Sequence, residues 1–263
     1  MKFKKIIWDY YKKNKRTLFW REKITPYYVF VSEVMLQQTQ VSRVEKKFPQ
    51  FIKEFPDFKS LAHATNKKLL QVWQGMGYNR RALYLKKIAE IIMRKYKGMI
   101  PKRPDLLDEL PGIGQTTALS IIVFAYNLPH IFIETNIRRV FIHSFFADSE
   151  NINDKDIFPL VKKTLDKKNP REWYYALMDY GSHLPKITKN PNRKSKHYKK
   201  QSRFHGSNRE IRGAIIKSIL KKSLTLNELT KKTQLERNKI YANLLELQKE
   251  GFIMEKRGKY YIK

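Results

Sequence analysis

Residues 110–122 read LPGIGQTTALSII, in which two glycines stand two positions apart directly before an apolar helical segment. Glycine lets backbone N–H groups approach a ligand closely, and the N-terminus of a helix attracts anions. A phosphate group of nucleic acid suits that position. The pattern by itself leaves a second interpretation open, in which Gly112 and Gly114 only form a sharp turn between two helices.

The charge of the whole chain agrees with an anionic partner. The 263 residues include 55 Lys and Arg against 24 Asp and Glu, a formal net charge of +31, and this excess is spread along the sequence. Such a protein is expected to bind a polyanion. Because the sequence shows no apolar run of about 18 residues and no signal-peptide pattern, we expect a soluble, monomeric, cytoplasmic protein, nucleoid-associated if it is bacterial.

Cysteine is absent from the sequence. Disulfides, thiolate zinc sites, iron–sulfur clusters and cysteine nucleophiles are therefore excluded together. We expect neither a metal site nor a cofactor.

Apolar residues recur at helical spacing along most of the chain, whereas alternating strand-like runs are scarce before residue 250. Stops such as FPDF, GMGYN and KGMIPKRPD divide the first 145 residues into short helices joined by brief turns. The sequence therefore predicts an almost all-helical protein.

The C-terminal part changes character at Lys186. The segment from Lys186 to Arg203 holds eight Lys or Arg and no acid, without apolar periodicity, which is typical of a linker or of a loop that becomes ordered on contact. Residues 207–263 then predict three helices followed by two β-rich pieces, the pattern of a small winged helix. Such a domain binds DNA or docks another protein, and the pattern leaves both open.

Two acids stand out in this basic chain. Glu33 lies in SEVMLQQTQ, residues 32–40, between an apolar stripe and a group of amides. Glu134 lies in IFIETNIRRVF, residues 131–141, after an apolar run and before two arginines. Burial would raise the pKa of this carboxyl and the arginines would lower it, so the sequence leaves the balance open.

Several motifs in order resemble the helix-hairpin-helix DNA glycosylase superfamily, and most closely its adenine-specific branch, the MutY type. The motifs are FW, TPYYVFVSEVMLQQTQV, VWQGMGYNRRALYL, LPGIGQTTA, ETNIRRV and ALMDYG. The resemblance covers residues 1 to about 185. It implies a two-lobed all-α fold whose cleft holds Glu33 and Glu134. We expect a core of residues 1–206 and a winged-helix-like domain of residues 207–263. The core would comprise a six-helix lobe from about 22 to 134, a second lobe from 1–21 plus 135–185, and a basic loop, 186–206.

The resemblance also implies roles for individual residues. Glu33 would be the general acid that protonates the flipped-out base, and Glu134 would stabilise the oxocarbenium-like sugar, either electrostatically or as a transient nucleophile. The family usually has Asp at that second place. Side chains implied to contact the base or the DNA are Trp20 and Arg21 in the base pocket, Leu36, Gln37, Gln38 and Tyr78 in the stack vacated by the base, Leu110, Gly112, Gly114 and Thr116 in the hairpin, and Asn136.

Four departures from the family bear on mechanism. Thr116 stands where strand-nicking relatives carry a lysine, and a hydroxyl cannot form a Schiff base, so we expect a monofunctional enzyme. Tyr175 replaces a Glu or Gln expected to read the adenine edge; it is equally well a core aromatic. The Nudix-like domain of bacterial relatives is replaced by the winged helix. The places of the four cluster-binding cysteines fall at Pro185, Asn192, Ser195 and Gln201.

The expected function is that of a base-excision-repair glycosylase. Its substrate would be duplex DNA containing adenine mispaired with guanine or 8-oxoguanine. Two alternatives are kept: a thymine or uracil mismatch glycosylase of the same fold, and a non-enzymatic DNA-binding protein built on the winged helix.

Overall fold

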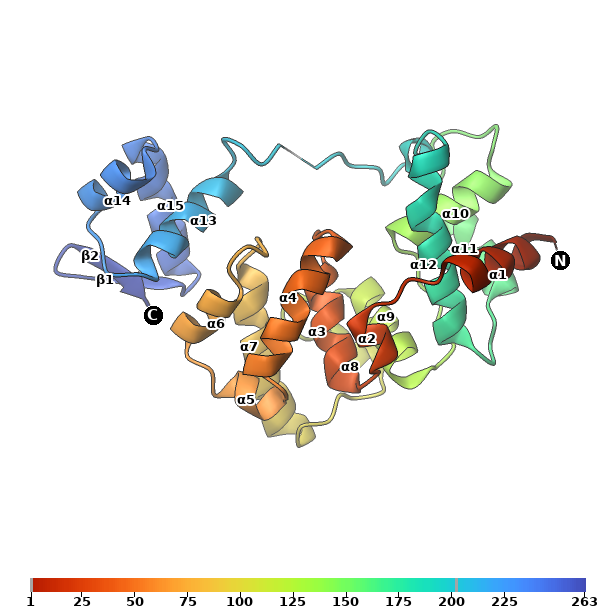
Figure 1. Ribbon diagram of the computed structural model, residues 1–263, viewed down its shortest axis with the longest axis horizontal. Coiled ribbons are helices and arrows are strands. Elements are labelled where there is room, and N and C mark those ends of the chain that lie inside the picture. Colours follow the sequence, from red (N-terminus) through yellow and green to blue (C-terminus); the bar gives the residue numbers. More distant parts are fainter. Residues whose placement is uncertain (1, 202) are drawn as a thin grey trace. The chain divides into compact units, whose positions relative to one another are not determined.

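The computed structural model describes residues 2–201 and 203–263 and is built mainly of helices, with one small C-terminal hairpin, as Figure 1 shows. The chain forms two compact units, residues 1–33 with 100–200 and residues 34–99 with 201–263. The all-helical prediction is confirmed. The lobe boundaries drawn from the sequence divide the chain at other positions and stay a prediction.

The first unit gathers helices from both ends of its sequence around an aromatic core. Phe124, Phe132, Phe141, Trp173 and Tyr174 are all buried in it. The elements are α1 (Lys2–Asn14), α2 (Phe19–Glu22), most of α3 (Pro26–Leu36), α8 (Pro104–Asp108), α9 (Gln115–Tyr126), α10 (Thr135–Phe145), α11 (Asp154–Thr164), α12 (Pro170–Ile187) and the 3₁₀ turn η1 (Pro191–Lys194).

Helices α10 and α12 pack closely at Gly181. A Cβ atom built at this position would lie 2.4 Å from the carbonyl oxygen of Asn136, so a larger residue would force the two helices apart. Arg139 reinforces the contact by donating to the Gly181 carbonyl at 2.7 Å. The close approach fixes the start of α10, where Glu134 and Asn136 lie.

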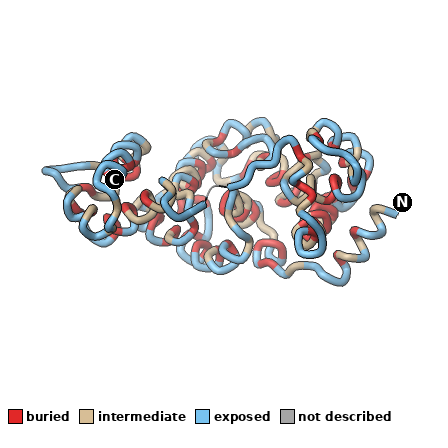
Figure 2. Tube along the Cα trace, turned by 90° about the horizontal axis from the view of Figure 1, so that it is seen from above, coloured by how far each residue is buried: buried red, intermediate tan, exposed pale blue. Residues whose placement is uncertain are grey.

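The second unit combines four helices of the central sequence with the C-terminal domain. Its central helices are amphipathic, and their buried faces include Phe48, Phe51, Leu85 and Ile88. Figure 2 shows buried and exposed stretches alternating along the chain. The elements are α4 (Val41–Glu54), α5 (Phe58–Ala62), α6 (Asn66–Val72), α7 (Arg80–Tyr96), α13 (Asn208–Ile219), α14 (Leu226–Thr233), α15 (Arg237–Lys249), β1 (Ile253–Lys256) and β2 (Lys259–Ile262).

The C-terminal domain has the helices and hairpin expected of a small winged helix. Strands β1 and β2 pair antiparallel with Lys256 opposite Lys259. Arg257 and Gly258 form the two-residue turn with φ of 52° and 72°, the left-handed backbone that tight hairpins need. Leu224, before α14, exchanges two backbone hydrogen bonds with Tyr260 and so anchors the hairpin to the helices.

No helix within residues 2–201 and 203–263 is both long enough and apolar enough to span a membrane.

Candidate active site

Glu33 lies near the end of α3, a helix that is apolar on nearly all sides. Its carboxylate accepts a hydrogen bond of 2.6 Å from the hydroxyl of Ser120 on α9. Burial raises the pKa of Glu33 to about 7; the Ser120 hydrogen bond opposes this rise, the negative charge of Glu134 adds to it, and Arg21 opposes it. At neutral pH the side chain therefore retains a proton in a large share of molecules, as a general acid must.

Glu134 is held in a different way, as the N-cap of α10. Its carboxylate accepts backbone N–H groups of Asn136 at 2.7 Å and Ile137 at 2.9 Å, and the Asn136 side-chain amide at 3.2 Å. Burial raises the pKa of this group, while the two N–H donors and the nearby Arg139 and Arg138 oppose the rise. Because the N-terminus of a helix favours negative charge, Glu134 is the member of the pair suited to stay ionised.

Asn136 has a fixed orientation beside this carboxylate. Its Oδ1 accepts from Arg139 at 2.9 Å, so its Nδ2 is turned toward Glu134. The sequence placed Asn136 among residues that contact DNA or base. The structure shows it bound to the second acid, and its predicted contact with substrate stays a prediction.

Ser120 was missed by the sequence reasoning. Its hydroxyl lies 2.6 Å from Glu33 and 2.9 Å from the Thr117 carbonyl, yet it carries one proton. It can donate to an ionised Glu33, or donate to Thr117 and accept from a protonated Glu33. Ser120 therefore accommodates both protonation states of the acid. A serine inside a helix normally donates to a carbonyl three or four residues earlier in the same helix. The sequence therefore did not indicate that Ser120 contacts Glu33.

Arg21 and Trp20 belong to the framework beneath Glu33. Trp20 is buried, and the Arg21 guanidinium stacks over the Tyr175 ring at 4.1 Å and donates to Asp179 at 2.8 Å. Tyr175 in turn stacks on Phe124 with 4.8 Å between ring centroids. Tyr175 is therefore a core aromatic in this structure. The predicted contacts of Trp20, Arg21 and Tyr175 with an extruded base stay predictions.

Two loops in the second unit carry the residues expected to enter the DNA stack. Gln38 is exposed and follows α3, and Tyr78 is partly exposed and precedes α7. Both have left-handed backbones, with φ of 53° and 47°. Leu36 and Gln37, beside Gln38, are partly buried. The structure therefore presents Gln38 at a tight turn, as the interpretation requires.

Arg81 joins these two loops and was also missed. Its buried guanidinium donates to carbonyls of the first loop, Met35 and Gln37 at 2.7 Å each, and to that of Gly77 in the second at 3.1 Å. It also donates to the Thr39 hydroxyl at 2.9 Å. One side chain thus fixes the backbones on which Gln38 and Tyr78 stand. The motif GMGYNRRALYL contained this arginine and Gly77, but not its partners Met35, Gln37 and Thr39.

Tyr78 has further contacts with the C-terminal segment. Its hydroxyl accepts from Arg209 at 2.9 Å and from the side-chain amide of Gln201, and the Arg209 guanidinium lies 5.4 Å from its ring centroid. Arg81 lies 5.5 Å from the same ring centroid. The expected intercalating tyrosine is therefore held between two arginines.

The hairpin residues have the geometry expected for anion binding. Gly112 has φ of 77° in the turn after α8, and Gly114, which has no side chain, is the N-cap of α9. Thr116 is exposed in the first turn of α9, whereas Leu110, before the turn, is buried. A phosphate at this helix end stays a prediction.

The basic segment after α12 is more ordered than the sequence suggested. Asn192 is buried and donates to the Thr135 carbonyl at 2.9 Å, and the backbone around Ser195 pairs with Ile152 through two 2.9 Å hydrogen bonds. The expectation of a linker is therefore wrong for residues 188–196, whereas ordering of the basic loop on contact with a partner stays a prediction. Asn192 and Ser195 stand where relatives have cluster cysteines, and they hold this turn by hydrogen bonds, so the site does not fit an iron–sulfur cluster.

The fold and these motifs agree with a known family. The model of the HhH-GPD superfamily base excision DNA repair protein matches residues 31–165, just over half of the 263 residues. The chain belongs to this superfamily. The helix-hairpin-helix glycosylase fold and the family expected from the sequence are thereby confirmed.

Named relatives within the superfamily are adenine DNA glycosylases. That of Buchnera aphidicola subsp. Baizongia pistaciae is 37% identical over 177 residues, which are 66% of this chain and 50% of that protein. That of Mycobacterium tuberculosis is 36% identical over 180 residues, 66% and 58% respectively. The human protein is 29% identical over 192 residues, 68% and 35% respectively. The chain spans about half the length of the relatives it matches.

Solved structures confirm the fold. A thermostable thymine-DNA glycosylase superposes with a TM-score of 0.64 at 22% identity, covering 72% of this chain and 91% of that one. A non-covalent endonuclease III–DNA complex gives 0.59 at 18% identity, covering 71% and 87%. At these identities the likeness concerns the fold alone.

Proposed function

We propose that this superfamily member is a monofunctional DNA glycosylase that hydrolyses the N-glycosidic bond of adenine mispaired with guanine or 8-oxoguanine. The observation that carries the proposal is the pair of differently held acids. Burial and the charge of Glu134 raise the pKa of Glu33 to about 7, whereas the N-terminus of α10 supports negative charge on Glu134. Two carboxyls with opposite protonation are what hydrolysis of a glycosidic bond requires.

In the proposed reaction, Glu33 donates its proton to the purine as the bond between N9 and C1′ breaks. Positive charge develops on the sugar, and the Glu134 carboxylate stabilises it. Water then adds to C1′ and passes one proton to the Glu33 carboxylate, which restores the acid and leaves an abasic site. Thr116 stands where strand-nicking relatives carry a lysine and offers only a hydroxyl, so no Schiff base forms there and the strand stays intact.

Duplex DNA is the proposed partner. The net charge of +31 favours a polyanion. Gln38 and Tyr78 stand on loops fixed by Arg81, which suits side chains that occupy the gap left by an extruded base. Extrusion costs a few kcal/mol, and rigid occupants of the gap offset that cost. The relatives named as adenine DNA glycosylases favour adenine as the base.

The test is single-turnover excision on duplexes that carry adenine opposite 8-oxoguanine, adenine opposite guanine, thymine opposite guanine, or uracil opposite guanine. We expect release of adenine only, with strand breaks appearing only after alkali. Glu33→Gln should lower the rate by at least about 100-fold while duplex affinity is retained. The matched control is Glu45→Gln, an exposed acid on α4.

Each other outcome has a definite meaning. Release only of thymine or uracil would replace the adenine assignment with the pyrimidine alternative. Strand breaks without alkali would contradict the monofunctional mechanism. If no base is released from any duplex but all duplexes are bound, the protein acts as a DNA-binding protein and the catalytic proposal is wrong.

A further inference from the structure

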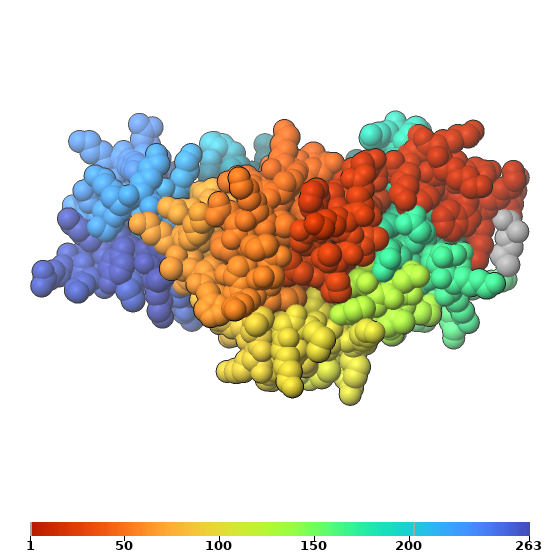
Figure 3. Space-filling view, turned by 60° about the horizontal axis from the view of Figure 1, so that its bottom comes forward, coloured from red at the N-terminus to blue at the C-terminus, as the bar shows by residue number. Residues whose placement is uncertain are grey.

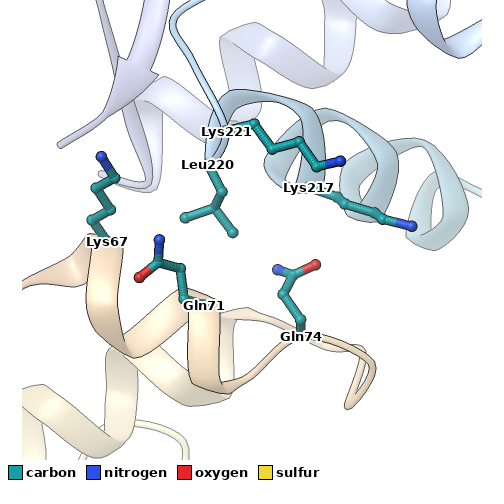
Figure 4. A pocket seen from close by; sticks show the side chains of 6 residues that line it. All are labelled: Lys67, Gln71, Gln74, Lys217, Leu220 and Lys221. Atoms are coloured by element: carbon teal, nitrogen blue, oxygen red, sulfur yellow. The ribbon is translucent and has the colours of Figure 1, made fainter.

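A basic cleft lies in the second unit, between α6 and α13. It has a volume of about 570 Å³ and is lined by Lys67, Gln71, Gln74, Lys217, Leu220 and Lys221. Figure 4 shows Lys67 and Gln71 on α6 and Gln74 just after it, facing Leu220 at the end of α13, with Lys217 and Lys221 on the α13 side. Residues about 150 positions apart in the chain thus form one concave surface.

The charge of the cleft is uncompensated. No acidic residue lines it, and none of its three lysines has a carboxylate partner among residues 2–201 and 203–263. The neighbouring Lys68 differs, because it pairs with Glu54 at 2.6 Å. Gln71 and Gln74 add amide donors between the ammonium groups. The lining therefore suits an anion with several oxygens in a row.

A shared carboxylate joins α13 to α7, the helix that follows α6 in the chain. Glu250, at the end of α15, accepts from Arg80 of α7 at 3.2 Å and from Arg212 of α13 at 2.5 Å. Figure 3 shows the C-terminal segment, in blue, against the surface of residues 34–99, in orange and yellow. Both ion pairs of Glu250 are with arginines, Arg80 and Arg212, and neither involves a lysine of the cleft.

Each wall of the cleft is connected along the chain to a residue at or in contact with Tyr78. On one side Gln74 precedes Tyr78 by four residues, and on the other Arg209, which donates to the Tyr78 hydroxyl, lies eight residues before Lys217. Eight helical residues span about 12 Å. Duplex DNA rises about 3.4 Å per base pair, so this distance corresponds to roughly three to four base pairs.

We propose that the cleft between α6 and α13 binds the phosphodiester backbone of duplex DNA, three to four nucleotides from the mispaired base. The inference rests on the proposed function for the position of Tyr78 at the mispair. It assigns the C-terminal domain a part in DNA binding through its α13 lysines. The shape and lining suit consecutive phosphates on one strand, which Lys67, Lys217 and Lys221 neutralise from opposite walls.

The test compares two variants with the same change of charge. Lys67→Gln/Lys217→Gln/Lys221→Gln removes the cleft charge, and Lys162→Gln/Lys163→Gln/Lys167→Gln removes three exposed charges of the first unit. Affinity for a mispaired duplex is measured from low to high salt. Each phosphate contact contributes about 0.9 to 1 to the slope of log affinity against log salt. We expect the cleft variant to lose about 2 to 3 from that slope and the control variant less than about 1.

A second measurement locates the contact. Methylphosphonates, which carry no charge, replace single phosphates along each strand. For the wild type, substitution three or four nucleotides from the mispair on one strand should weaken binding several-fold, and the cleft variant should be insensitive to it. Equal slopes for the two variants, or unchanged sensitivity in the cleft variant, would overturn the assignment. Selective loss of binding to single-stranded RNA or to polyglutamate, with duplex binding intact, would overturn it as well.

The outcome is separable from that of the proposed function. Excision by the wild type is measured on the same duplexes, and the salt slope is also measured on a fully paired duplex that offers no substrate. If the cleft variant has a smaller salt slope but the wild type excises no base, the cleft binds DNA and the glycosylase proposal is wrong. If the wild type excises adenine but the salt slope of the cleft variant is unchanged, the glycosylase proposal holds and the cleft assignment is wrong.

Discussion

Arg81 is a buried charged residue and Glu33 a half-buried one, and they differ in how many hydrogen-bond partners satisfy the charge. Arg81 donates to carbonyls of Met35, Gln37 and Gly77, and burial lowers its pKa only to about 10. Glu33 has one hydroxyl donor and a second acid nearby. Arg81 has hydrogen-bond acceptors for its charge and so holds the two loops in place. Glu33 has few donors to stabilise its charged form, so it keeps a proton that is available for chemistry.

Replacing Arg81 should cause the largest change in stability. Arg81→Leu keeps an apolar stem but leaves several buried carbonyls without donors, so we expect a loss of about 3 kcal/mol or more in the free energy of unfolding. Urea denaturation measures it. The control is the adjacent Arg80→Leu, whose exposed ion pair with Glu250 is worth less than about 1 kcal/mol. Equal losses in the two variants would mean that the comparison drawn above is wrong.

The pH dependence of excision tests the other side of the comparison. Glu33 must hold its proton to act, and its pKa is about 7, so the proton is present below that pH and lost above it. We expect a rate that falls about tenfold per pH unit above pH 7 as Glu33 loses its proton, and that falls again at acidic pH where Glu134 becomes protonated. Duplex affinity is measured in parallel to separate binding from chemistry. If the excision rate did not change between pH 6 and pH 9, Glu33 would not be the titrating acid.

The poorly satisfied carboxyl should also lower stability. Since burial raises the pKa of Glu33 from 4.5 to about 7, the wild type loses stability as the pH rises through that window. Glu33→Gln carries no charge, so it should be more stable than the wild type at pH 8, by on the order of 2 kcal/mol, and equal at pH 4. Thermal or urea unfolding at both pH values measures the difference. Glu45→Gln should show no such pH-dependent gain.

Ser120→Ala should have the smallest effect. The Ser120 hydrogen bond lowers the pKa of Glu33, so its loss should move the midpoint of the pH–rate profile upward by about half to one pH unit. The control is Ser32→Ala on α3, because that hydroxyl donates to the Val29 carbonyl at 2.9 Å. A downward move, or the same move in both variants, would contradict the role given to Ser120.

Much of the fold was predictable because helices are encoded locally. Apolar spacing and stops such as Gly98 and Gly114 indicated the helices, and the motifs around Glu33 and Glu134 indicated the two acids. The segment after Ile187 was misjudged because its order depends on Asn192 reaching the Thr135 carbonyl, 57 residues away. Charge and composition gave no sign of that hydrogen bond.

The sequence alone determined the all-helical class, the family motifs, the two acids and the absence of thiolate chemistry. Only the tertiary structure decided how each buried charge is satisfied. Ser120 meets Glu33 across 87 residues, Arg81 meets Met35 across 46, and Arg209 meets Tyr78 across 131. The physical reason is that helical periodicity acts over a few residues, whereas a buried polar group takes its partner from whichever element packs against it.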